Sequence, residues 1–129
     1  MFTLNMITPN GKPRKVQTEI CNLVTPQGQM GILSNHMPLV TMIEISMMTT
    51  VENGVRTEYA IAGGLFFFKD NEATILSDAI ESEAEIDLER AKAAKERAEA
   101  LLQSNNPDID IKRAEVALRK AINRINVSQ

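Results

Sequence analysis

The chain is poor in the residues from which catalytic, metal and disulfide sites are built. It has one cysteine, Cys21, one histidine, His36, and no tryptophan. A single cysteine excludes an internal disulfide and favours a reducing compartment. The sequence also lacks a Cys/His cluster of zinc-site spacing, an EF-hand loop and a G-x-x-x-x-G-K-[ST] phosphate loop. We therefore expect no metal site and no catalysis within this chain.

Long apolar runs are also missing. No stretch approaches the ~20 apolar residues of a membrane span, and the start, Met1 to Leu4, lacks the charged and apolar regions of a signal peptide. A formal net charge of −3 does not suggest a partner among nucleic acids. These features predict a cytoplasmic protein without direct membrane insertion.

What is present divides the chain into two parts. All six glycines and four of the five prolines fall in the first 64 residues, and no alanine precedes Ala60. After Ala84 alanine and charge become dense, and Pro107 is the only breaker. The composition predicts a turn-rich β domain over residues 1–84 and a helical domain over residues 85–129.

The first part shows the pattern of short strands joined by tight turns. Alternation over 2–6 and β-rich runs over 16–24, 39–51, 65–68 and 73–76 predict strands. Asn53-Gly54 is a strong hairpin signal, and Asp70-Asn71 predicts another turn. Gly63-Gly64 suggests a strand bend or close packing. This spacing favours an antiparallel sandwich or a flattened barrel.

The second part shows helical periodicity. Ser82 to Glu85 has the form of a capping box, and Asp87 is a competing N-cap. Pro107-Asp108 is the expected start of a second helix. Apolar residues then recur at a three-four spacing in both helices: Ala91, Ala94, Ala98 and Leu101, then Ile111, Ala114, Leu118, Ala121 and Ile125. Two such faces separated by a short loop predict an antiparallel helical hairpin.

Little apolar surface is available to hold that hairpin on the β domain. Its first face is mostly alanine, and no aromatic residue follows Phe68. Helices of this length are marginal alone. We expect docking to be favoured by only a few kcal/mol, a margin that a ligand could change.

The helical part also carries cations in register. Arg90 and Arg97 share one face, and Arg113, Lys120 and Arg124 line a stripe on the second helix. Two such stripes facing each other could hold a polyphosphate, because arginine binds phosphate bidentately. The alternative is a solvated face with salt bridges to nearby carboxylates, which would come from Glu96, Glu99 and Glu115.

Several motifs, taken in order, resemble the epsilon subunit of F-type ATP synthases. They are G-Q-M-G-I-L at 28–33 with H-M-P-L at 36–39, A-G-G at 62–64, and I-D-L-E-R-A at 86–91. The last is similar to the I-D-x-x-R-A motif of epsilon subunits that bind ATP. The resemblance spans the whole chain. It implies an N-terminal antiparallel ten-stranded β-sandwich followed by a C-terminal two-helix antiparallel hairpin.

The resemblance also implies partners and a role. The sandwich would contact the gamma subunit and the c ring, on the cytoplasmic face of the bacterial plasma membrane. The hairpin would permit turnover when folded down. Extended, it would meet the alpha and beta subunits and block ATP hydrolysis. ATP would act as a regulatory ligand that favours the folded-down form, with no metal required.

Residue by residue, the resemblance implies a nucleotide site. The positions that match are Glu81, Ile86, Asp87, Arg90, Ala91, Arg97, Arg113, Lys120 and Arg124. Glu81 would help to hold base and sugar, and the cations would face phosphates, with Lys120 as a point charge where a relative has arginine.

Two segments depart from the family pattern. Ser34-Asn35 replaces a Pro-Gly turn, which asparagine can also adopt. Phe66 to Phe68 is more apolar than usual, so one ring must point outward from a regular strand. The run either belongs to a tight core or a sheet edge, or contacts the gamma subunit or the c ring.

Overall fold

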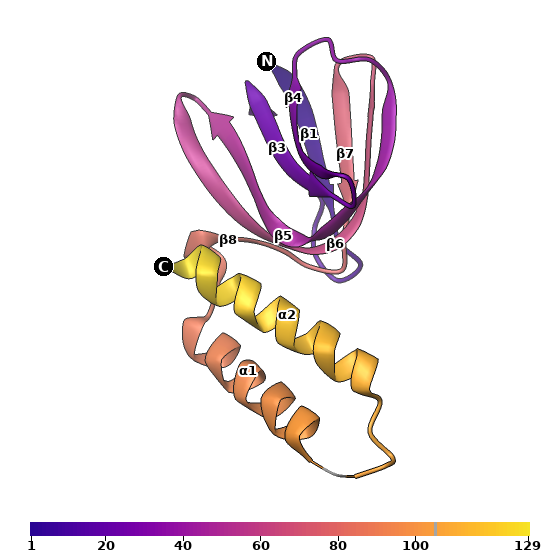
Figure 1. Ribbon diagram of the computed structural model, residues 1–129. Helices are drawn as coiled ribbons and strands as arrows, with labels where there is room; N and C mark the ends of the chain where they lie inside the picture. The colour runs from indigo at the N-terminus through magenta and orange to yellow at the C-terminus, as the bar shows by residue number, and fades with distance from the viewer. Residues whose placement is uncertain (105) are drawn as a thin grey trace.

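The computed structural model describes residues 1–104 and 106–129, and shows a folded β-sheet standing on a pair of helices (Figure 1). The strands are β1 (Phe2–Ile7), β2 (Arg14–Thr18), β3 (Ile20–Thr25), β4 (Gly28–Leu33), β5 (Leu39–Glu52), β6 (Val55–Lys69), β7 (Glu72–Leu76) and β8 (Ile80–Ser82). A 3-10 turn, η1 (Glu83–Glu85), leads to the helices α1 (Leu88–Gln103) and α2 (Ile111–Ser128).

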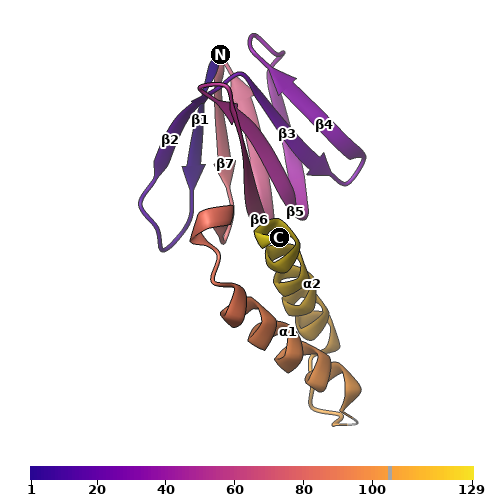
Figure 2. The same ribbon diagram turned by 90° about the vertical axis from the view of Figure 1, so that its left-hand side faces the viewer.

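All eight strands belong to one sheet in the order β2-β1-β7-β6-β5-β3-β4, with β8 paired to β6. The sheet folds over so that β1, β2 and β7 lie on one side and β3 and β4 on the other (Figure 2). The expectation of ten antiparallel strands is corrected to eight in the described residues, with one parallel pair, β1 with β7. The count is lower because β5 and β6, of 14 and 15 residues, each run unbroken from one layer to the other.

The bend that lets these two strands serve both layers lies at Gly63-Gly64. The β5–β6 register is the same on both sides of this point, with Ile43↔Gly64 and Ile45↔Ala62, but Glu44 and Gly63 between them are not paired. Both glycines have positive φ, 80° and 145°. A Cβ on Gly64 would overlap the carbonyl oxygen of Leu76. The glycine pair therefore serves both a bend and a close backbone approach, as expected.

The other sequence signals in the β domain are largely confirmed. Asn53-Gly54 joins β5 to β6 with φ of 53° and 76°, and Asp70-Asn71 joins β6 to β7 with φ of 54° and 59°. Parts of the strand prediction were wrong. The stretch 16–24 is two strands separated at Glu19, β6 begins well before the run at 65–68, and β4 and β8 were not predicted.

The core lies between the layers and contains most of the large apolar side chains. Phe66 and Phe68 are fully buried, whereas Phe67 between them points outward and is 37% exposed. The aromatic run thus contributes two rings to the core and one to the surface. Cys21 is also buried, and this burial raises the pKa of its thiol to about 12, which makes it a small core hydrophobe.

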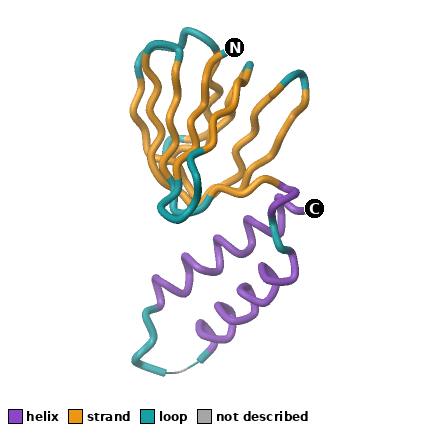
Figure 3. Tube along the Cα trace, turned by 180° about the vertical axis from the view of Figure 1, so that it is seen from behind, coloured by secondary structure: helices purple, strands orange, loops and turns teal. Residues whose placement is uncertain are grey.

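The two helices run side by side in opposite directions (Figure 3). Alanines fill their seam: Ala91 and Ala98 of α1 and Ala114 and Ala121 of α2 are buried. The expected start of the second helix at Pro107-Asp108 is wrong. Helix α2 begins at Ile111, because the Asp110 carboxylate accepts a hydrogen bond from the backbone N–H of Arg113 at 3.1 Å and caps the helix there.

Helix α2 is the element that connects the hairpin to the sheet. Near its C-terminal end Val127 is fully buried, and Asn123 Nδ2 donates to the Ser46 carbonyl at 2.8 Å. The N-terminal half of α2 extends away from the sheet with α1 (Figures 1 and 2). None of the helices described is both long and apolar enough to cross a membrane.

Gly64 lies against the backbone of β7, so a side chain at this position should destabilise the domain. Gly64→Ala should destabilise the domain by about 3 kcal/mol, because the new methyl group meets a backbone carbonyl that cannot move without disturbing β7. Gly28→Ala is the matched control: Gly28 also has positive φ, 121°, but a Cβ there meets nothing within 4 Å, so the cost should be about 1–2 kcal/mol. Urea unfolding of both variants measures the difference, and equal losses would contradict the steric account.

Candidate functional site

A charged cleft of about 430 Å³ lies where the hairpin leaves the sheet. Strand β8, η1, α1 and α2 all contribute to its wall. The lining residues are Glu81, Glu85, Asp87, Arg90, Ala91, Ala94, Arg97 and Arg124. A hollow of similar size, about 420 Å³, lies beside Gly63-Gly64 and is mostly apolar. The volume of the cleft at the hairpin therefore does not distinguish it from the other hollow. What distinguishes it is the presence of three guanidinium groups, those of Arg90, Arg97 and Arg124.

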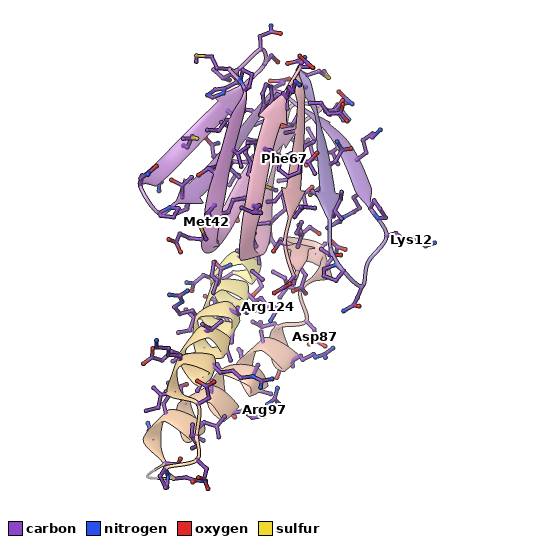
Figure 4. All side chains as sticks on the ribbon, turned by 90° about the vertical axis from the view of Figure 1, so that its right-hand side faces the viewer. Lys12, Met42, Phe67, Asp87, Arg97 and Arg124 are labelled. Atoms are coloured by element: carbon purple, nitrogen blue, oxygen red, sulfur yellow. The ribbon has the colours of Figure 1, made fainter. Side chains whose placement is uncertain are left out.

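Helix α1 supplies one wall through residues one turn apart. Arg90, Ala94 and Arg97 recur at a four-three spacing, which places them on one helix face. Asp87 caps the helix, and its carboxylate accepts the backbone N–H of Arg90 at 3.1 Å. Figure 4 shows Asp87 at the start of α1 and Arg97 further along it, with Arg124 on the neighbouring helix. The Asp87 carboxylate is thus engaged in fixing where α1 begins.

Helix α2 and strand β8 supply the opposite wall. Arg124 Nε donates to Glu81 Oε1 at 2.6 Å, and each side chain is 30% exposed. This ion pair bridges the helical hairpin and the β domain. An anionic ligand in the cleft would compete with Glu81 for the Arg124 guanidinium.

Glu85 closes the cleft at the junction between sheet and helix. Its carboxylate accepts from the Ser82 backbone N–H at 3.0 Å and pairs with the Arg14 guanidinium at 2.7 Å. Partial burial works to raise the pKa of Glu85, but the hydrogen bonds from Ser82 and the contacts with Arg14 outweigh it and hold that pKa below its usual value. The predicted capping box is present, in η1. Helix α1 itself is capped by Asp87.

The structure brings together six of the nine residues that the sequence singled out. Glu81, Asp87, Arg90, Ala91, Arg97 and Arg124 line the cleft. Lys120 lies instead with Arg124 beside a much smaller hollow, of about 10 Å³. Arg113 is exposed near the start of α2, and Ile86 joins η1 to the N-cap of α1. The two cationic stripes therefore meet only where the hairpin joins the sheet, at Arg90, Arg97 and Arg124. We call this place the hairpin root.

Three residues at or behind the cleft were missed. Ala94 shares the helix face of Arg90 and Arg97, so helical spacing could have indicated it. The sequence pattern indicated Glu85 only as a capping residue. Arg14 lies 71 positions away, and no sequence signal connects it with Glu85. As for the alternative of a salt-bridged face, the ion pairs found in residues 1–104 and 106–129 do not include Glu96, Glu99 or Glu115.

Two family models match, and together they cover the whole chain. The beta-sandwich domain of the ATP synthase delta/epsilon chain matches residues 1–83, and the long alpha-helix domain of the same chain matches residues 84–129. The first is the folded sheet and the second is η1 with the helical hairpin. Fold and models together define a non-catalytic stalk subunit of a rotary ATPase.

Bacterial relatives agree over almost the full length. The ATP synthase epsilon chain of Desulfitobacterium hafniense strain Y51 is 42% identical over 128 residues, which cover 99% of this chain and 96% of the relative. That of Ligilactobacillus salivarius strain UCC118 is 38% identical over 133 residues, covering 100% and 96%. The chain therefore belongs to the delta/epsilon chain family of ATP synthases, and the resemblance to the epsilon subunit seen in its motifs is confirmed.

Solved structures support the fold. A chain of the Euglena gracilis mitochondrial ATP synthase, in a structure of OSCP, F1 and the c ring, superposes with a TM-score of 0.74 at 23% identity, covering 93% of this chain and 76% of that one. A chain of the Tetrahymena thermophila mitochondrial enzyme, in a structure of the central stalk and c ring, gives a TM-score of 0.58 at 13% identity, covering 98% and 92%. At these identities the likeness concerns the fold alone.

The lowered pKa of Glu85 should make the free energy of unfolding depend on pH. Because its folded-state pKa is lowered, Glu85 should stabilise the junction above the pKa that it has when unfolded, and this contribution should be lost as the pH falls through the folded value. The difference in unfolding free energy between wild type and Glu85→Gln should therefore shrink towards acid pH. Glu83→Gln, at an exposed position in the same turn, is the control and should show no such trend. A Glu85 carboxyl that titrates at or above the ordinary value of about 4.3 by NMR would contradict the assignment.

Proposed function

We propose that this chain is a regulatory and coupling subunit of the central stalk in a bacterial F-type ATP synthase, and that its helical hairpin senses ATP. The observation that carries the proposal is the cleft at the hairpin root. It gathers Asp87, Arg90 and Ala91 of the I-D-L-E-R-A motif with two further arginines, Arg97 and Arg124, from separate turns and helices. The complex would lie at the cytoplasmic face of the plasma membrane, with this subunit peripheral.

The cleft has the chemistry that a nucleoside triphosphate requires. Arg90 and Arg97 can direct guanidinium donors at phosphate oxygens from one helix face, and Arg124 approaches from α2. Ala91 and Ala94 leave a shallow apolar floor on which base and sugar can rest without an aromatic partner. Glu81 is placed to accept hydrogen bonds from base or ribose. The site would bind ATP as a signal, without hydrolysis and without a metal requirement.

Binding in this cleft would favour the docked hairpin for a simple reason. The wall is formed by β8 and η1 from the sheet side and by α1 and α2 from the hairpin, so the complete site exists only when the two are together. A ligand that binds one conformation stabilises it in proportion to RT ln(1 + [L]/Kd). Without a ligand, the free energy that holds the hairpin on the sheet would be modest. The seam of the hairpin is alanine, and its contact with the sheet is confined to one end of α2.

Without nucleotide, the hairpin would extend and inhibit ATP hydrolysis. Helix α2 carries five Lys/Arg and one Glu between residues 111 and 128, a strongly basic rod. Such a rod suits acidic surfaces on the alpha and beta subunits. Lys120 and Arg113, which do not line the nucleotide cleft, would act in this extended state.

An exposed apolar face of the sheet is the proposed contact with the gamma subunit and the c ring. Cross-strand partners place its members in adjacent rows: Ile7 beside Leu76, Leu76 beside Leu65, Leu65 beside Met42, and Phe67 beside Val40. All six side chains are at least 36% exposed. Contiguous exposed apolar surface marks an interaction site, and the outward ring of Phe67 lies within it.

The nucleotide proposal is tested by calorimetry on an arginine variant. Arg90→Ala should weaken ATP binding by roughly 1.5–3 kcal/mol, the usual contribution of a hydrogen bond to a charged group. Arg119→Ala is the matched control, because Arg119 is exposed on α2 and does not line the cleft. An unchanged affinity in the Arg90 variant, with the fold intact, would refute the role assigned to it.

The second candidate is a rotor subunit that is purely structural, or a helical-hairpin adaptor without a ligand. The sheet and its apolar face would serve such a protein equally well. Complete absence of binding at millimolar ATP would leave only this candidate. So would a fluorescence distance between sheet and α2 that stays the same with and without nucleotide.

The apolar face has its own test in a pair of identical substitutions. Val40→Asp should weaken association with the gamma subunit about tenfold or more, since it places a charge within the apolar rows. Val55→Asp makes the same change at a similarly exposed valine, the first residue of β6, at the opposite end of the β5–β6 pair, and should have little effect. Pull-down or surface-binding titration with the gamma subunit measures both, and equal losses would count against this face.

A further inference from the structure

Arg14 lies outside the cleft, yet it is tied to one of the cleft carboxylates. At the start of β2, its Nη1 donates to Glu85 Oε1 at 2.7 Å and its Nη2 donates to the Ile80 carbonyl at 3.1 Å. The guanidinium carbon also lies 5.7 Å from the centre of the Tyr59 ring. These three contacts, from three segments of the chain, favour one orientation of a side chain that is 37% exposed.

The ring against which Arg14 rests is itself fixed. Tyr59 is almost fully buried in β6, and its hydroxyl donates to Glu52 Oε2 at 2.8 Å. A cation over an aromatic face that cannot rotate is attracted by the ring quadrupole. Arg14 is therefore a positive charge that the β domain directs towards η1.

The charges of the cleft show why that position matters. Three carboxylates, Glu81, Glu85 and Asp87, line it together with the three arginines. Glu81 pairs with Arg124 inside the cleft, and Asp87 accepts a backbone N–H of α1. Glu85 is different because its cationic partner comes from outside the cleft. Without Arg14 its negative charge would face a triphosphate directly.

We propose that Arg14 is a positioning residue for the nucleotide cleft: it turns the Glu85 carboxylate towards β2 and neutralises it, so that the arginines of the cleft determine its potential. The proposal deepens the function proposed above and rests on it. It assigns a role in ligand affinity to a residue of the β domain that does not touch the ligand. It also makes the site depend on the contact between β2 and η1.

The test is a double-mutant cycle on ATP affinity by calorimetry, using the full chain. Arg14→Gln should weaken ATP binding about fivefold, the effect of one unscreened charge near a polyanion. The double variant Arg14→Gln with Glu85→Gln should return to within about twofold of wild type, because the exposed charge is gone. AMP, with fewer charges, should lose less than ATP in the single variant. Arg56→Gln removes a similar ion pair, with Glu58, away from the cleft and should leave affinity unchanged.

Two results would overturn the proposal. One is an unchanged ATP affinity in Arg14→Gln. The other is a double variant that binds as weakly as Arg14→Gln, which would show that Arg14 acts only as a mechanical tie. Circular dichroism and thermal melting of every variant keep a folding defect separate from either result.

A second measurement needs no nucleotide and separates this proposal from the one on which it rests. Arg14→Gln should raise the NMR titration midpoint of the Glu85 carboxyl in the nucleotide-free chain, while Arg56→Gln should not. If wild type bound no ATP, the sensing function would fail, yet a raised midpoint would still uphold the neutralisation of Glu85 by Arg14. An unmoved midpoint would overturn that neutralisation whatever the result with ATP.

Discussion

The end-on docking of α2 against the sheet is the contact on which the rest of the molecule depends. It consists of a buried Val127, one hydrogen bond from Asn123 to the Ser46 carbonyl, and the ion pair of Arg124 with Glu81. The alanine seam joins α1 to α2 and not to the sheet, so the hairpin is held on the sheet by contacts such as these. Of these contacts, the Arg124–Glu81 ion pair also forms part of the wall of the charged cleft. A ligand that binds in this cleft, as we propose, would therefore favour the docked position of the hairpin.

The sheet supplies a rigid platform for that equilibrium. Its two long strands pass between layers at Gly63-Gly64, and the sharp bend brings β8 and η1 to the edge where α2 docks. One side of the platform exposes the apolar rows around Phe67 and Val40, and the end of the sheet carries the cleft. The proposed rotor contact and nucleotide site therefore use separate surfaces, so that the subunit could stay attached while its hairpin moves.

Sequence reasoning succeeded where the physical cause is local. The turns at Asn53-Gly54 and Asp70-Asn71 follow from residues that tolerate positive φ, and the alanine seam follows from helical spacing. It was wrong where a competing local cap was overlooked or where a longer-range choice intervened. The start of α2 moved from Pro107 to Ile111 because Asp110 caps it, and the strand count fell because β5 and β6 bend without breaking. The parallel pairing of β1 with β7 joins segments far apart in the chain and left no local pattern.

The amino-acid sequence by itself determined the division into a β part and a helical part, the family, and which arginines share a helix face. Composition and periodicity act over a few residues, so they can be read along the chain. Only the tertiary structure decided which of those cations meet. Arg124 reaches the cleft and Arg113 does not, because α2 crosses the hairpin root at one end only. The partnership of Arg14 with Glu85 likewise arises from folding, since 71 positions separate the two residues and β2 is not a sheet neighbour of β8.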